Sequence, residues 1–150
     1  MWLKDFFGNE ILITAVVAWF VAQVIKFFTV LIEEKRINFE RLVGSGGMPS
    51  SHASFVTALT TSVGLNVGFS SPLFAVCFVF SFVVMYDASG VRRAAGKQAE
   101  LLNKLVENFR RERLEVTGER LKELLGHTHL EVVAGAVLGA ALAILEYNIF

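Results

Sequence analysis

The most constraining feature of this chain is a series of apolar segments that are long enough, or nearly long enough, to cross a lipid bilayer. The chain is 54% hydrophobic, and its mean hydropathy is +0.56. A helix needs about 20 largely apolar residues to cross the hydrocarbon core. We therefore expect an all-α fold, with one integral membrane domain over residues 1–150 built as a bundle of about four transmembrane helices. The expected spans are about residues 11–32, 53–69, 73–89 and 131–146.

The second expected span is less apolar than the others. Its polar residues include Thr57, Thr60, Thr61, Ser62 and Asn66. Such side chains suit a helix that packs inside a bundle better than one that faces lipid. The pairs Gly64-x-x-x-Gly68 and Gly135-x-x-x-Gly139 also permit close helix contacts. We expect these contacts within one chain, and a homo-oligomer through the same glycine faces is the alternative.

A polar stretch, residues 91–130, separates the third span from the fourth. Its apolar residues Leu101, Leu102, Leu105, Val106 and Phe109 share one face of a helix. We expect a cytoplasmic helical insertion over about residues 93–126, with an amphipathic helix that lies on the membrane surface or caps the bundle. The alternative is a soluble hairpin that contacts only its own helices.

The distribution of basic residues predicts the orientation in the membrane. With four spans, residues 32–53 and 89–130 form two loops on the same side, and they hold 12 of the 14 Lys and Arg residues. The positive-inside rule places this side in the cytoplasm and both termini outside. The first ten residues have mixed charge and lead into an apolar run with no clear small-residue cleavage site. We therefore expect a retained span and a multi-pass protein of the cell membrane. The 14 acidic residues balance the 14 basic ones, so the net charge gives no indication about nucleic acid. We expect the lipid bilayer as partner, and no nucleic acid.

The segment before the second span has the composition of an anion-binding loop. Two glycines, Pro49, Ser50, Ser51 and His52 precede or begin this span. Backbone N–H groups at a helix start, small side chains and an imidazole suit a phosphate. Lipid phosphate is the expected ligand, because the loop lies at a membrane surface. Either serine also suits the N-cap of the span, which is the structural alternative.

Further residues with reactive or charged side chains gather at helix ends on the same side. They are Lys26 in the first span, Asp87, Arg92 and Arg93 at the end of the third, and His127, His129 and Glu131 at the start of the fourth. His127 and Glu131 are four residues apart, so a helix puts them on one face. Thr128-x-x-Glu131 also has the pattern of a capping box, so the presence of Glu131 has a structural explanation as well as a functional one.

These residue types suit phosphoryl transfer. Cations and helix-terminal N–H groups neutralise phosphate oxygens and the charge that develops in the transition state. One imidazole can attack phosphorus while a second protonates the leaving oxygen, and a carboxylate can orient the first.

On three segments the chain resembles the type-2 phosphatidic acid phosphatase superfamily, which is related to vanadium haloperoxidases. It looks most like the divergent bacterial and plant branch. The matching segments are Gly47–His52, Tyr86–Gly96 and Gly126–Val132. The resemblance implies that His127 is the nucleophile, that Glu131 replaces its usual Asp partner and that His52 is the general acid. It implies phosphate contacts for Lys26, Ser50 and Ser51.

The chain also departs from the superfamily pattern. Glu33 stands where an Arg-Pro pair is expected seven positions after Lys26, and no Ser-Arg pair precedes His127. We expect Arg92 and Arg93 to supply the missing charge from another helix end. Asp87 has no counterpart, and it is a candidate ligand for a divalent cation such as Mg²⁺. The leading mechanism requires no cofactor.

The sequence thus predicts a membrane-embedded phosphatase that hydrolyses a lipid phosphate or diphosphate, polyprenyl or phosphatidate-like, through a histidine nucleophile. One alternative is a lipid-headgroup binding or transport module without turnover. Another is a metal-dependent membrane hydrolase with ligands drawn from His127, His129, Glu131, Asp87 and His52.

Overall fold

The computed structural model describes residues 2–34, 47–111 and 126–149, and these residues are almost entirely helical. The helices are α1 (Trp2–Phe7), α2 (Glu10–Glu34), α4 (Ser51–Val67), α5 (Pro72–Ser89), α6 (Val91–Arg111) and α7 (His129–Ile149). The predicted all-α class is confirmed. Three stretches are long and apolar enough to cross a membrane, namely Glu10–Ile32, Pro72–Phe109 and His129–Ile149.

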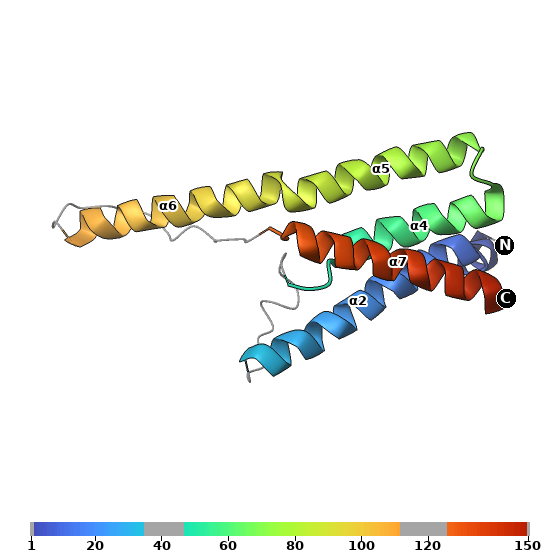
Figure 1. The fold of residues 1–150 in the computed structure, drawn as a ribbon, viewed down its shortest axis with the longest axis horizontal. Helices are drawn as coiled ribbons and strands as arrows, with labels where there is room; N and C mark the ends of the chain where they lie inside the picture. Colours follow the sequence, from blue (N-terminus) through green and yellow to red (C-terminus); the bar gives the residue numbers. More distant parts are fainter. Residues whose placement is uncertain (1, 35–46, 112–125, 150) are drawn as a thin grey trace.

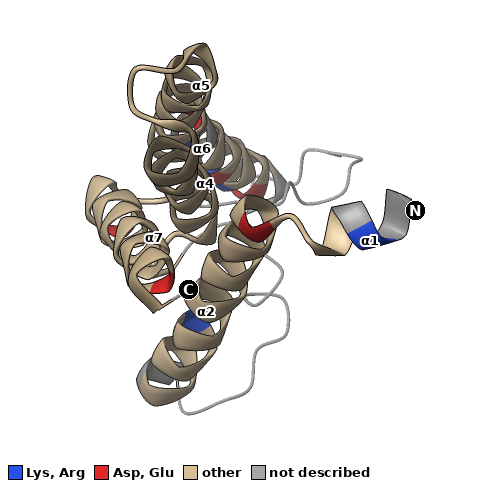
Figure 2. Ribbon diagram, turned by 90° about the vertical axis from the view of Figure 1, so that its right-hand side faces the viewer, with Lys and Arg blue, Asp and Glu red and all other residues tan. Residues whose placement is uncertain are grey.

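Helices α2, α4, α5 and α7 form the bundle, and α4 is its central member. It packs against each of the other three (Figure 1). The two termini lie at one end of the bundle, and residues 47–50 and 126–128 lie at the opposite end (Figure 1). This is the topology that the sequence predicts, with the segments that flank both polar loops on one side. Most of the ribbon of the bundle helices is free of charged residues (Figure 2).

Hydroxyl groups fix the neighbours of α4. Ser54 Oγ donates to the Ala18 carbonyl of α2 at 3.0 Å, and Thr57 Oγ1 donates to the Ala136 carbonyl of α7 at 3.1 Å. The Ser81 hydroxyl of α5 donates to the Val56 carbonyl at 2.9 Å. Such a bond between membrane helices contributes about 0.6 to 2 kcal/mol. The interior position predicted for 53–69 is therefore confirmed.

The glycines of α7 let it approach α4 directly. A Cβ atom at Gly135 would lie 2.2 Å from the Ser50 carbonyl oxygen, and one at Gly139 would lie 2.2 Å from that of Ser54. The predicted contact within one chain is confirmed, and this face has no room for a second copy. Gly64 is covered by the ring of Phe69, and Gly68 ends α4 with φ of +104°. A homo-oligomer through a glycine face, our alternative, stays a prediction.

Helix α6 continues beyond the bundle in nearly the direction of α5 (Figure 1). A helix in the predicted amphipathic stretch is confirmed as far as Arg111, whereas residues 112–125 of the expected insertion lie outside the described part of the chain. Within that part α6 packs substantially against α5 alone, so it does not cap the bundle as we expected. Leu101 and Phe109 on its apolar face are exposed.

Candidate functional site

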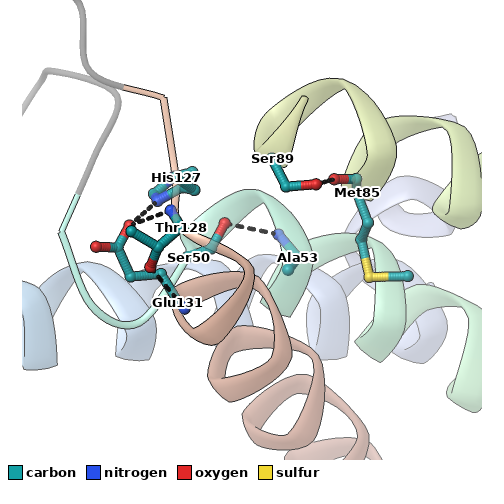
Figure 3. Close-up of polar contacts among 7 residues, drawn as sticks. All are labelled: Ser50, Ala53, Met85, Ser89, His127, Thr128 and Glu131. Atoms are coloured by element: carbon teal, nitrogen blue, oxygen red, sulfur yellow. Dashed lines mark hydrogen bonds and ion pairs between the residues drawn. The ribbon is translucent and has the colours of Figure 1, made fainter. Parts of the chain in front are cut away.

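A histidine–carboxylate pair stands at the start of α7. Nδ1 of His127 lies 3.0 Å from Oε2 of Glu131, and the His127 side chain is only 2% exposed (Figure 3). The same Oε2 accepts the Thr128 backbone N–H at 3.2 Å, and the Glu131 N–H donates to Thr128 Oγ1 at 3.3 Å. Glu131 therefore both closes the predicted capping box and holds the imidazole. Enclosure strengthens this second contact, because a low local dielectric screens it less than water does.

Two backbone hydrogen bonds join the three segments of the site. The His127 N–H donates to the Ala88 carbonyl in the last turn of α5 at 3.0 Å. The Ser50 N–H donates to the Glu131 carbonyl at 3.0 Å. The start of α4, the end of α5 and the start of α7 are thereby held together. No sequence pattern indicates these bonds, since main-chain groups carry no residue signature.

His52 in the first turn of α4 lies beside His127. The two ring centroids are 6.1 Å apart, with an interplanar angle of 65°. The structure thus brings together the two histidines that were expected to share a site, although they are far apart in the sequence. The first turn of α4 positions His52, and the segment just before α7 positions His127.

Ser50 is the N-cap of α4, as the structural alternative predicts. Its Oγ accepts the Ala53 N–H at 3.4 Å, and the residue is fully buried. The Ser50 N–H donates to the Glu131 carbonyl, so this N–H is not available for the phosphate contact that the resemblance implies for Ser50. Ser51 is buried at the first position of α4, where backbone N–H groups have no carbonyl partner within the helix.

Lys26 reaches the same loop from α2. It is only 3% exposed, so its side chain is enclosed by protein. A lysine in a membrane span can instead extend its side chain to the membrane surface, and Lys26 does not do so. The side chain passes over Gly47, where a Cβ atom would lie 3.1 Å from Lys26 Cε. Gly47 has φ of +86°, a left-handed conformation that suits glycine.

Gly47→Ala is expected to lower the free energy of unfolding by about 1 to 2 kcal/mol, because alanine at positive φ is strained and its methyl group crowds Lys26. Thermal unfolding in detergent measures the change. A double-mutant cycle with Lys26→Ala separates the two causes, since shortening Lys26 removes the crowding and leaves the backbone strain. Coupling of about 0.5 kcal/mol or more is expected, and strictly additive effects would rule out the contact.

The remaining candidates lie around this cluster. Asp87 is half-buried in the last turn of α5, next to Ala88, and Arg92 and Arg93 belong to the first turn of α6. The side chains of both arginines lie outside the described part of the structure. His129 is exposed at the first position of α7.

A metal centre is not formed by the candidate ligands. Among residues 2–34, 47–111 and 126–149, no group of three His, Cys, Asp or Glu side chains is arranged to hold a metal ion. The ligand sets predicted for the metal-dependent alternative are therefore not assembled in the described geometry. Asp87 stands as a single candidate ligand for a cation such as Mg²⁺.

Two comparisons with known proteins found sequences that are similar to this chain. The sequence model of the divergent PAP2 family matches residues 7–142. The chain is 41% identical over 146 residues to "Uncharacterized membrane protein YuiD" of Bacillus subtilis (strain 168), an alignment that covers 91% of this chain and 92% of the relative. No solved structure shows a significant match.

Proposed function

The chain belongs to the divergent PAP2 family, and from this membership we propose that it is a multi-pass membrane phosphatase. Its substrate is a lipid phosphate or diphosphate of the polyprenyl or phosphatidate class. The single observation that carries the proposal is the enclosed His127–Glu131 pair facing His52. A capping box alone requires neither a buried imidazole at its carboxylate nor a second histidine beside it.

The pair supports a nucleophilic role for His127. An ionised Glu131 favours the tautomer with the proton on Nδ1, which leaves the Nε2 lone pair to attack. Attack on phosphorus forms the N–P bond and makes the imidazole cationic, and the carboxylate 3.0 Å from Nδ1 stabilises that charge. In this scheme Glu131 orients the nucleophilic histidine and stabilises its charge, the role that aspartate has in the superfamily.

His52 is the proton donor in this scheme. As the P–O bond to the lipid breaks, its imidazolium gives a proton to the leaving oxygen and becomes neutral. The neutral ring then takes a proton from water as that water attacks the phosphohistidine. Inorganic phosphate leaves, and both histidines return to their starting forms. Lys26, the Ser51 N–H, Arg92 and Arg93 are the groups that we assign to the phosphate oxygens.

We also place the site at the cytoplasmic membrane surface. The termini and the site lie at opposite ends of the bundle (Figure 1). The two loops on the site's side hold most of the Lys and Arg residues, which favours retention in the cytoplasm.

A substrate panel tests the function. Purified protein is expected to release inorganic phosphate from at least one of phosphatidic acid, a polyprenyl phosphate and a polyprenyl diphosphate, with release inhibited by vanadate and unaffected by chelator. Retained lipid phosphate without any release would instead support the binding module. Release that is lost on chelation and restored by Mg²⁺ would support the metal-dependent alternative.

A further inference from the structure

An apolar groove of about 400 Å³ runs along the membrane-spanning part of the bundle. Helix α4 forms its floor, and α5 and α7 form its walls. Among its lining residues are Thr57, Phe74, Phe78, Met85, Val137 and Ala140. Phe78 and Val137 are also exposed on the outside of the bundle, where hydrocarbon surrounds a spanning helix. A lipid chain can therefore enter this groove sideways from the bilayer.

One end of the groove adjoins the histidine site. Met85 and Ala136 line the groove and also pack against the buried cluster of Ala53, Ala88 and Val132. The Ala88 carbonyl accepts the His127 N–H. Met85 is three residues before Ala88 on α5, a separation of about 4.5 Å along the helix. The groove thus begins roughly one turn below the site.

The groove has the length of one leaflet. From Met85 to Phe74, α5 rises by about 16 Å at 1.5 Å per residue. The hydrocarbon core of a bilayer is about 30 Å thick, so the groove spans roughly half of it. A ring contact between Phe69 and Phe74, with centroids 5.2 Å apart, lies at the far end. These dimensions match a single hydrocarbon chain that descends from a headgroup at the site.

The polar floor of the groove does not require a polar ligand. The Thr57 hydroxyl is bonded to backbone carbonyls on α4 and α7. The Thr60 hydroxyl is bonded to the carbonyls of Val56 and Cys77 and to Ser81 Oγ. Because these hydroxyls have partners within the protein, a hydrocarbon chain can cover them without leaving a hydrogen bond unmade.

We propose that this groove binds one hydrocarbon chain of the lipid whose phosphate occupies the His52–His127 site. The assignment rests on the proposed function. Hydrocarbon that moves from a bilayer into an apolar groove gains little hydrophobic energy, since both environments lack water. The groove therefore acts mainly by orienting the lipid and holding its phosphorus in line with His127.

Ala140→Phe tests the groove by partly filling it, and Ala141→Phe is the matched control. Ala140 lines the groove, whereas its neighbour Ala141 is exposed and lies outside the lining. With dipalmitoyl phosphatidic acid, Ala140→Phe is expected to lower kcat/KM about tenfold. With dibutyryl phosphatidic acid, whose chains are too short to occupy the groove, both variants are expected to match the unaltered protein within a factor of two.

The outcomes separate the two proposals. Equal losses on both substrates, or no loss on the long one, would overturn the groove while leaving the phosphatase intact. If the unaltered protein hydrolyses neither substrate, photocrosslinking of the full chain decides the groove independently. A phosphatidic acid with a photoreactive group at its chain terminus is expected to label α5 around Phe74. Labelling confined to exposed α2 residues such as Phe20 would overturn the proposal.

Discussion

Replacing His127 with alanine is expected to reduce phosphate release at least about a thousandfold, because the variant lacks the imidazole that forms the N–P bond in the proposed mechanism. The main-chain hydrogen bond from residue 127 to Ala88 survives the change, as does the capping box of Thr128 and Glu131. The variant should therefore fold. Release of inorganic phosphate from the best substrate of the panel measures the loss, and the elution profile in detergent checks the fold.

His129→Ala is the matched control for this variant. His129 is also a histidine at the start of α7, but it is exposed, whereas His127 is enclosed. Its removal should change turnover by less than about twofold, as for a surface residue without a specific role. Undiminished turnover by His127→Ala would exclude the histidine nucleophile. Equal losses in the two variants would show that the loss comes from disturbed folding at the start of α7 and not from lost chemistry.

Gly139→Leu is expected to prevent stable folding, with a loss of about 3 kcal/mol or more in the free energy of unfolding. Even a Cβ atom there would lie 2.2 Å from the Ser54 carbonyl oxygen and 2.4 Å from Thr57 Oγ1. The carbonyl belongs to the central helix and cannot rotate away, so α7 would have to separate from α4. The separation would also break the hydrogen bond from Thr57 to Ala136.

Yield of monodisperse protein and thermal unfolding in detergent measure this effect. Ala141→Leu is the control, because the same side chain is added two residues away at an exposed position. It should leave the unfolding midpoint within a few degrees of the unaltered value. An unchanged midpoint for Gly139→Leu would mean that α7 does not pack on α4 through this glycine.

The apolar segments made the bundle predictable, because their length and composition belong to the chain itself. The pairing of His127 with Glu131 was predicted from helical spacing. In the structure α7 begins only at His129, so His127 lies before the helix, next to the capping box of Thr128 and Glu131. The interior position of α4 was also readable, because a helix rich in Thr and Ser finds hydrogen-bond partners more easily inside a bundle than in lipid. For Lys26 the sequence predicted only its position along the first span, and not which residues it contacts. Its contact with Gly47 depends on packing between segments about 20 residues apart.

The direction of α6 was not readable from the sequence. An amphipathic pattern shows that one face of a helix is apolar, but it does not say what covers that face. Gly90 lies between α5 and α6. In the structure Gly90 has φ of −105°, and its N–H donates to the Tyr86 carbonyl as in a continuing helix. The two helices therefore remain nearly aligned (Figure 1).

The bonds from Ser50 to Glu131 and from His127 to Ala88 connect main-chain atoms. The arrangement of the three backbone segments at the site therefore depends little on which side chains they carry. Short of a proline at position 50 or 127, no substitution removes either donor. Substitutions elsewhere in the site can therefore change its charge or size while both main-chain hydrogen bonds, and with them the junction of α4, α5 and α7, stay in place.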